Sequence, residues 1–146
     1  MSPARKSASA TVTSIATAPT RATPVPTILV IEDYRDTRHM ISTLLQSEGY
    51  NVIEAEDGIE GVLKAGNLYP DLILMDLSLP EMDGVEAAAR IHAQAKLSRI
   101  PIFVVSAYLT KEVERDARAA GCVETFSKPL DTDALLEKIE STLNSR

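Results

Sequence analysis

Polar residues that can do chemistry follow four short apolar runs of this chain. They are, in chain order, Glu32 and Asp33 after Ile28–Ile31, Asp76 after Leu72–Met75, Ser106 after Ile102–Val105, and Lys128 after Val123–Ser127. If each run is a buried parallel strand, these side chains emerge at the carboxyl edge of one sheet, where open α/β folds place their sites. The sequence therefore predicts one pocket that holds three carboxylates, one hydroxyl and one ammonium group.

The carboxylate of Asp76 is well placed to attack phosphorus. It ends the most continuously apolar run, and a carboxylate in such a position can act as a nucleophile and form an acyl phosphate. Glu32 and Asp33 beside it would repel it and each other, which raises the pKa of at least one of these groups. A hard divalent cation relieves the repulsion, and Mg²⁺ prefers carboxylate, water and phosphate oxygens. The sequence therefore predicts magnesium-dependent phosphoryl chemistry at Asp76.

Composition excludes several other classes of function. The chain has 146 residues, the length of one ordinary domain, and its 45% hydrophobic content allows one core. Its net charge of −6 becomes −9 over residues 27–146, which opposes binding to nucleic acid. Cys122 is the single cysteine, so no intramolecular disulfide or thiolate cage for a metal can form. The apolar runs are shorter than the roughly 20 residues of a membrane helix, so we expect a cytoplasmic protein without membrane contact.

Residues 1–26 differ in composition from the rest of the chain. They consist mainly of Ala, Ser, Thr, Pro and Val, contain no acidic or aromatic residue, and show no apolar periodicity. Such a segment cannot bury enough apolar surface to offset the cost of ordering it, so it is predicted to be a disordered tail. An organellar transit peptide, which is also acid-free and rich in Ser and Thr, is the alternative.

From Thr27 onward, apolar runs alternate with helical patterns, which is typical of a parallel sheet with crossover helices. Asn51–Ala55 supplies a fifth strand, and we expect Ile59, Val62 and Leu63 to form the buried face of the second helix. The predicted N-cap residues of the second, fourth and fifth helices are Asp57, Thr110 and Asp131. The predicted fold is one domain with a single, doubly wound, five-stranded parallel sheet flanked by five helices.

Together these motifs resemble the receiver domain of two-component response regulators, over about residues 27–146. The resemblance implies a flavodoxin-like fold with strand order 2-1-3-4-5 and a cis bond between Lys128 and Pro129. It also implies the roles of the site residues: Asp76 as phosphoacceptor, Asp33 and Asp76 as direct Mg²⁺ ligands, Glu32 as a ligand through water, the backbone carbonyl of Ser78 as a further ligand, and Ser106 and Lys128 as partners of the phosphoryl oxygens.

The function that the resemblance implies is a stand-alone response regulator. It would take a phosphoryl group from a sensor histidine kinase or a histidine phosphotransfer protein and change its affinity for an effector, without being an enzyme. The rival class is a phosphatase or phosphotransferase with an aspartyl-phosphate intermediate. Haloacid-dehalogenase-type enzymes of that class carry a second Asp two residues after the nucleophile, where this chain has Ser78. A degenerate receiver that acts as a binding scaffold is a third reading, weakened because the implied site residues are all present.

Thr125 departs from the common pattern of the family. Many receivers carry an aromatic residue three positions before the lysine, and Phe126 cannot replace it because strand alternation points Phe126 to the opposite face. A small β-branched side chain cannot bury or expose the area of a ring. We therefore expect a helical phosphotransfer partner to be recognised at the first helix, around Tyr34, Arg35, Thr37 and Arg38.

Overall fold

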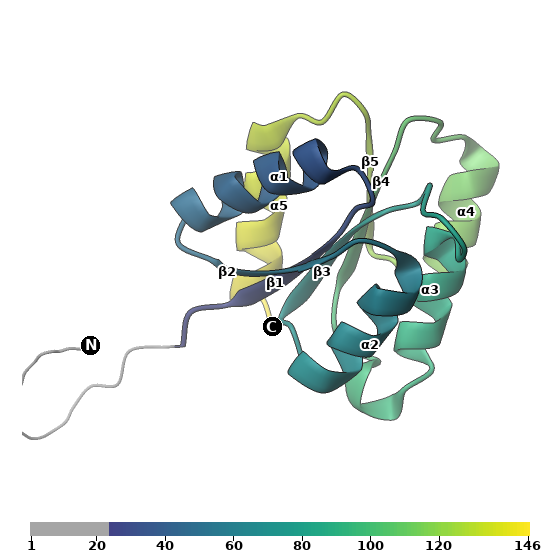
Figure 1. The fold of residues 1–146 in the computed structure, drawn as a ribbon, viewed down its shortest axis with the longest axis horizontal. Helices are drawn as coiled ribbons and strands as arrows, with labels where there is room; N and C mark the ends of the chain where they lie inside the picture. The colour runs from purple at the N-terminus through teal and green to yellow at the C-terminus, as the bar shows by residue number, and fades with distance from the viewer. Residues whose placement is uncertain (1–23) are drawn as a thin grey trace, which may run out of the picture.

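The computed structural model describes residues 24–146 (Figure 1). The predicted tail lies outside them except for its last three residues, of which Pro26 already accepts a hydrogen bond from the Asn51 amide at 3.0 Å. The elements in chain order are β1 (Thr27–Ile31), α1 (Arg35–Ser47), β2 (Asn51–Ala55), α2 (Gly58–Leu68), β3 (Leu72–Asp76), α3 (Gly84–His92), the 3-10 helix η2 (Ala95–Leu97), β4 (Ile102–Ser106), α4 (Lys111–Ala119), β5 (Glu124–Ser127) and α5 (Thr132–Asn144).

The five strands form one parallel sheet in the order β2-β1-β3-β4-β5, so the predicted fold class is confirmed. Parallel strands end at the same edge of a sheet. Asp76, the last residue of β3, is aligned with Val105 of β4, and Ser106 is aligned with Ser127 of β5. The polar residues that follow the strands therefore meet at one edge, as predicted from their positions in the sequence.

Helices cover both faces of this sheet. In Figure 1, α1 and α5 lie on one side, and α2, α3 and α4 lie on the other. Alternating residues of β1 show how a strand serves both layers: Ile28 and Val30 join the cluster beneath α1 and α5, whereas Leu29 and Ile31 join the cluster beneath α2, α3 and α4. The central strands β3 and β4 are buried at every position, as expected for strands covered on both faces.

The predicted N-caps of three helices are confirmed. Asp57, Thr110 and Asp131 each accept a hydrogen bond from the backbone amide three residues later, at 2.7 to 3.1 Å. Each such bond satisfies a donor that the first helical turn leaves free. Among the helices of residues 24–146, none is both long enough and apolar enough to cross a membrane.

The predicted buried face of α2 is confirmed for Val62, which is partly buried against the core, and is wrong for Ile59 and Leu63. Ile59 and Leu63 are 44% and 61% exposed, and the residues that face the sheet are small, with Gly61 and Ala65 buried. A Cβ atom at Gly61 would lie 2.4 Å from Cδ1 of Ile31. The helix therefore lies close to β1 along a stripe of small residues, and the side chains of Ile59 and Leu63 face outward.

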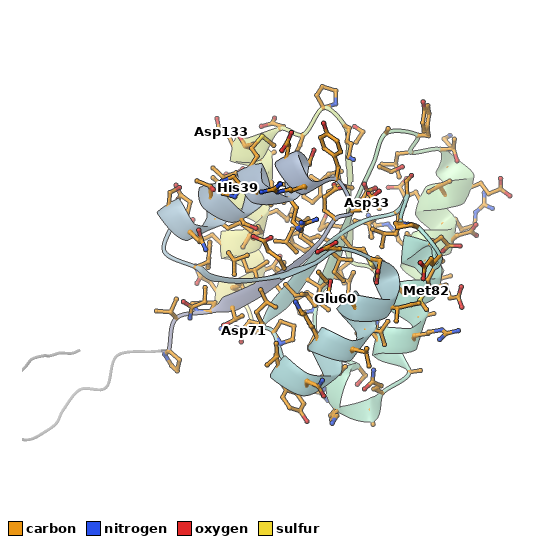
Figure 2. All side chains as sticks on the ribbon, in the orientation of Figure 1. Asp33, His39, Glu60, Asp71, Met82 and Asp133 are labelled. Carbon is orange, nitrogen blue, oxygen red and sulfur yellow. The ribbon has the colours of Figure 1, made fainter. Side chains whose placement is uncertain are left out.

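The two ends of the described chain are joined at the amino edge of the sheet. The carboxylate of Asp71 accepts the amide of Thr27 at 2.7 Å and pairs with the guanidinium of Arg146. Figure 2 shows Asp71 at this edge and Asp33 at the opposite, carboxyl edge. The chain thus enters and leaves the domain at the edge opposite the predicted pocket.

Candidate functional site

Three carboxylates from two strand ends lie together at the carboxyl edge. Glu32, Asp33 and Asp76 each offer a carboxylate oxygen, and these oxygens lie within 4.8 Å of one another. Glu32 and Asp76 are only 4% and 6% exposed, whereas Asp33 is exposed at the mouth of the cluster. The structure thus brings together the acidic residues that the sequence placed after different strands.

Both oxygens of the Asp76 carboxylate are engaged. Oδ1 accepts the backbone amide of Ser78 at 3.0 Å, and Oδ2 accepts the ammonium group of Lys128 at 3.1 Å. The same ammonium group lies 3.7 Å from Oε1 of Glu32. Partial burial lowers the pKa of Lys128, but the hydrogen bond and charge of Asp76, with the charges of Glu32 and Asp33, outweigh it and raise that pKa overall. Lys128 is therefore a fixed positive charge over the phosphoacceptor candidate.

Glu32 holds its proton more tightly than an ordinary glutamate. Its pKa is raised to about 7, mainly by burial and to a lesser extent by the neighbouring Asp76 and Asp33. The amide of Tyr34, which donates to Oε2 at 3.0 Å, and the Lys128 charge act in the opposite direction. A raised pKa for at least one of the carboxyl groups was predicted and is found for Glu32, but its main cause is burial, with the predicted crowding as a smaller contribution. A cation in the cluster would favour the ionised form of this carboxyl group.

Ser106 ends β4 beside the same edge. It is 4% exposed, its Oγ accepts the Tyr108 amide at 3.1 Å, and its carbonyl accepts the Lys128 amide at 2.9 Å. Lys128 is joined to Pro129 by a cis peptide bond, as the resemblance implied. Ser106 and Ser78 also line the mouth of a groove of about 720 Å³ between α3 and α4. The hydroxyl hydrogen of Ser106 remains available to a ligand that enters there.

The donor set of the carboxylate cluster fits Mg²⁺. Mg²⁺ is a hard cation that binds oxygen, usually through one or two carboxylates, with waters and phosphate completing its shell. Glu32, Asp33 and Asp76 supply oxygen alone, and the thiol of Cys122 is buried in the core beneath α2, α3 and α4. Ser78 follows Asp76 by two residues, and a role for its backbone carbonyl as a ligand stays a prediction.

The family assignment rests on this geometry together with sequence comparison. The family model for the response regulator receiver domain matches residues 28–140, which include all of the sheet except Thr27 and every residue of the pocket. The chain belongs to the response regulator receiver family. This places it among the proteins of two-component signalling, as the resemblance implied.

Known relatives of this receiver agree with the assignment. The polar-differentiation response regulator DivK of Brucella ovis is 33% identical over 116 residues, which are 80% of this chain and 94% of DivK. The chemotaxis protein CheY4 of Vibrio cholerae has a similar structure, with a TM-score of 0.77 and 28% identity over 81% of this chain and 98% of that one. The receiver domain of the histidine kinase PA1611 of Pseudomonas aeruginosa, solved with a magnesium ion in its active-site cleft, has a TM-score of 0.77 and 30% identity over 83% and 99% of the two chains.

Arg38 of the receiver is not a surface residue, so its predicted place in a recognition surface is wrong. Its side chain is 11% exposed and reaches across the start of α1 to Glu54 on β2. The helical spacing alone would have predicted this burial, because Arg38, Ile41 and Leu45 share one face of α1 and all are buried. Burial was not predicted because a long charged side chain usually lies on the surface.

Thr125 makes a polar contact in place of the usual aromatic side chain. Its hydroxyl donates to Oε2 of Glu114 on α4 at 3.0 Å, which ties β5 to that helix. Phe126 packs on the opposite face against Phe103, with ring centroids 5.7 Å apart. The predicted alternation of these two residues is confirmed.

Proposed function

We propose that this receiver accepts a phosphoryl group on Asp76 from the phosphohistidine of a sensor histidine kinase or a histidine phosphotransfer protein. The observation that carries the proposal is the position of the Asp76 carboxylate, which lies beside two other carboxylates and 3.1 Å from the Lys128 ammonium group. One nucleophile, one fixed cation and an acidic cluster for a metal are the parts that phosphoryl transfer to a carboxylate needs.

The transfer exchanges one bond for another. A carboxylate oxygen of Asp76 attacks phosphorus, the bond from phosphorus to the donor's imidazole nitrogen breaks, and the imidazole leaves with the bonding electron pair. The product is an acyl phosphate on Asp76. Attack frees the carboxylate from at least one of its present partners, which are the Ser78 amide and Lys128.

Lys128 and Ser106 are positioned to hold the phosphoryl group. Phosphoryl oxygens carry more charge than the carboxylate that Lys128 now contacts, so the ammonium group is expected to move from Oδ2 of Asp76 to one of them. The Ser106 hydroxyl accepts the Tyr108 amide and keeps its own hydrogen for another phosphoryl oxygen. These two contacts would draw the ends of β4 and β5 toward the modified residue and so change the surface that partners bind.

Mg²⁺ would be held by Asp33 and Asp76 directly, by Glu32 through water and by the Ser78 carbonyl. When bound, it supplies positive charge that offsets the phosphoryl oxygens and the crowded carboxylates. The magnesium ion in the active-site cleft of the PA1611 receiver domain supports this assignment.

The donor is expected to dock on α1 beside the pocket. Tyr34 and Met40 are 62% and 54% exposed, and Met40 lines a pocket of about 250 Å³ that also includes Lys128 and Leu130. A helix of the donor that covers these apolar side chains would bring its histidine to Asp76. The receiver would then act in the cytoplasm as a binding switch for an effector and would not turn over small phosphate esters.

The test is phosphorylation of the full chain by a small phosphodonor with Mg²⁺, followed by mass spectrometry. The parent should gain one phosphoryl group, and Asp76→Asn should gain none. Asp83→Asn is the matched control, because Asp83 is an exposed carboxylate near the site whose capping role an asparagine can keep. Undiminished labelling of Asp76→Asn would overturn the proposal, and steady turnover of phosphate esters would favour the phosphatase class.

A further inference from the structure

We propose that Arg38 positions the metal-binding carboxylates of Glu32 and Asp33 by holding the backbone of the turn that carries them. The inference rests on the magnesium site of the proposed function. It makes Arg38 a positioning residue, since its side chain acts through the turn and need not touch the metal or the phosphoryl group.

The contacts of the Arg38 guanidinium define this role. One Nη donates to the carbonyl of Glu32 at 2.8 Å and lies 3.5 Å from the carbonyl of Asp33, and Nε donates to Oε1 of Glu54 at 3.0 Å. The hydrogen bond to Glu32 is buried. One side chain of α1 therefore joins the turn after β1 to a residue of β2.

These contacts hold the backbone at Glu32 and Asp33, where its conformation determines the positions of the two carboxylates. The amide of Glu32 donates to the carbonyl of Ala55 at 3.0 Å, so β2 holds one side of the residue while Arg38 holds its carbonyl. The amide of Tyr34 then donates to Oε2 of Glu32 at 3.0 Å. Because Glu32 and Asp33 are adjacent, a rotation of the peptide group between them would move the Asp33 carboxylate away from Asp76. Arg38 opposes that rotation.

An arginine suits this task better than a lysine. The guanidinium is planar and presents five N–H donors in a fixed fork, so it can bind a carbonyl and a carboxylate at once. An ammonium group is a compact charge on a flexible stem and does not impose the same geometry.

The ion pair with Glu54 compensates the positive charge of Arg38 near the metal site. Glu54 offsets the positive charge of Arg38, so the guanidinium can hold the turn without adding a net charge that would repel a divalent cation. The side chain of Glu54 is 42% exposed, and such a pair contributes little to stability by itself. The carbonyl contacts are therefore the part of the arrangement that acts on the site.

The experiment is titration of the unphosphorylated full chain with MgCl₂ in a calorimeter. Arg38→Met keeps much of the packing and removes the donors, and it should weaken Mg²⁺ binding by about tenfold or more, as is usual when a partner of the ligating groups is lost. Arg38→Lys keeps the charge and should not restore the affinity. Glu54→Gln still offers an oxygen to Nε but no longer offsets the charge of Arg38, so it should weaken Mg²⁺ binding less than Arg38→Met does.

Arg118→Met is the matched control for the loss of a guanidinium. Arg118 also donates to a backbone carbonyl, that of Val123 at 3.0 Å, and pairs with a glutamate, Glu114, on α4. Its replacement should leave Mg²⁺ affinity unchanged. If Arg38→Met does not fold, the Mg²⁺ affinity of Arg38→Lys tests the inference in its place.

Two further readouts separate positioning from general stability. The Mg²⁺ concentration for half-maximal phosphorylation of Arg38→Lys should rise by the same factor as its dissociation constant, while the rate at saturating Mg²⁺ returns to that of the parent. In metal-free Arg38→Lys, the amide resonance of Tyr34 should shift relative to that of the metal-free parent. This shift would report a changed conformation of the turn directly.

Parental Mg²⁺ affinity in Arg38→Lys, or in a folded Arg38→Met, would overturn the inference, as would a parent that binds no Mg²⁺. If the parent binds Mg²⁺, the Arg38 variants bind it more weakly and the parent is still not labelled on Asp76, the proposed function is refuted and this inference stands.

Discussion

Glu32 should make the metal-free receiver less stable as the pH rises. Its pKa is about 7 in the folded protein, against 4.5 for an ordinary glutamate. Between these values the folded state binds more protons than the unfolded state. The stabilisation is therefore fully present below about pH 4.5 and is lost as the pH rises through about 7.

The size of the effect follows from the same two values. Each unit of pKa difference corresponds to about 1.4 kcal/mol, so the full difference corresponds to about 3 kcal/mol. Most of this falls between about pH 5 and pH 8, where we expect the free energy of unfolding of the parent to fall by about 2 to 3 kcal/mol relative to Glu32→Gln. The glutamine still offers an oxygen to the Tyr34 amide but cannot ionise.

The assay is urea unfolding of both proteins, followed by circular dichroism at several pH values without divalent cations. Taking the difference between parent and variant removes the contribution of the titrating groups that do not interact with Glu32. Excess Mg²⁺ at about pH 8 should then stabilise the parent more than the variant, because it binds the ionised carboxylates. Parallel stability curves from about pH 5 to pH 8 would refute the reasoning, since they would mean that Glu32 is ionised as easily in the fold as in water.

Three further predictions test other parts of the structure. Tyr34→Ala should slow phosphotransfer from a cognate phosphotransfer protein about tenfold, a typical loss for an aromatic contact, while Thr125→Val leaves the rate unchanged; the opposite result would place recognition on α4 and β5. Ser42→Ala should leave stability unchanged or raise it by about 1 kcal/mol in urea unfolding, because the buried hydroxyl has no hydrogen-bond partner within residues 24–146. Gly61→Ala should lower the free energy of unfolding by about 1 to 3 kcal/mol, and Ile31→Val should recover part of that loss if contact with Ile31 is the cause.

The strands and the edge that carries the site were predictable because the apolar runs and their polar endings are local features of the chain, whereas the order of the strands came from the family resemblance. A buried parallel strand is mostly apolar, so the polar residue at its end marks the edge. Asp76 at the end of β3 and Ser106 at the end of β4 are examples. The caps were predictable for the same reason, since Asp57 or Thr110 bonds to an amide only three residues away.

The predictions that failed depend on contacts between elements. Arg38 is of a residue type that usually lies on the surface. The carbonyl of Glu32 in the turn after β1 and the carboxylate of Glu54 on β2 make its burial favourable. Leu63 is of a residue type that usually lies in the core. Gly61, however, allows α2 to approach the sheet so closely that small side chains form the face that packs on the sheet. The hydrogen bond from Thr125 to Glu114 also requires knowledge of how α4 lies on β5.

Because Asp71 holds both described ends of the chain at one edge of the sheet, a tag or linker is best attached to this receiver at that edge. Thr27 and Arg146 meet at the amino edge of the sheet, while Asp76 and its neighbours open at the other edge. A fluorescent protein, an affinity tag or a sensor-chip linker joined after Arg146 would therefore project away from the pocket and from the start of α1. Immobilised in that orientation, the domain presents the edge that carries Asp76 to the solution, so binding of the proposed kinase or phosphotransfer partner can be measured without obstruction by the support.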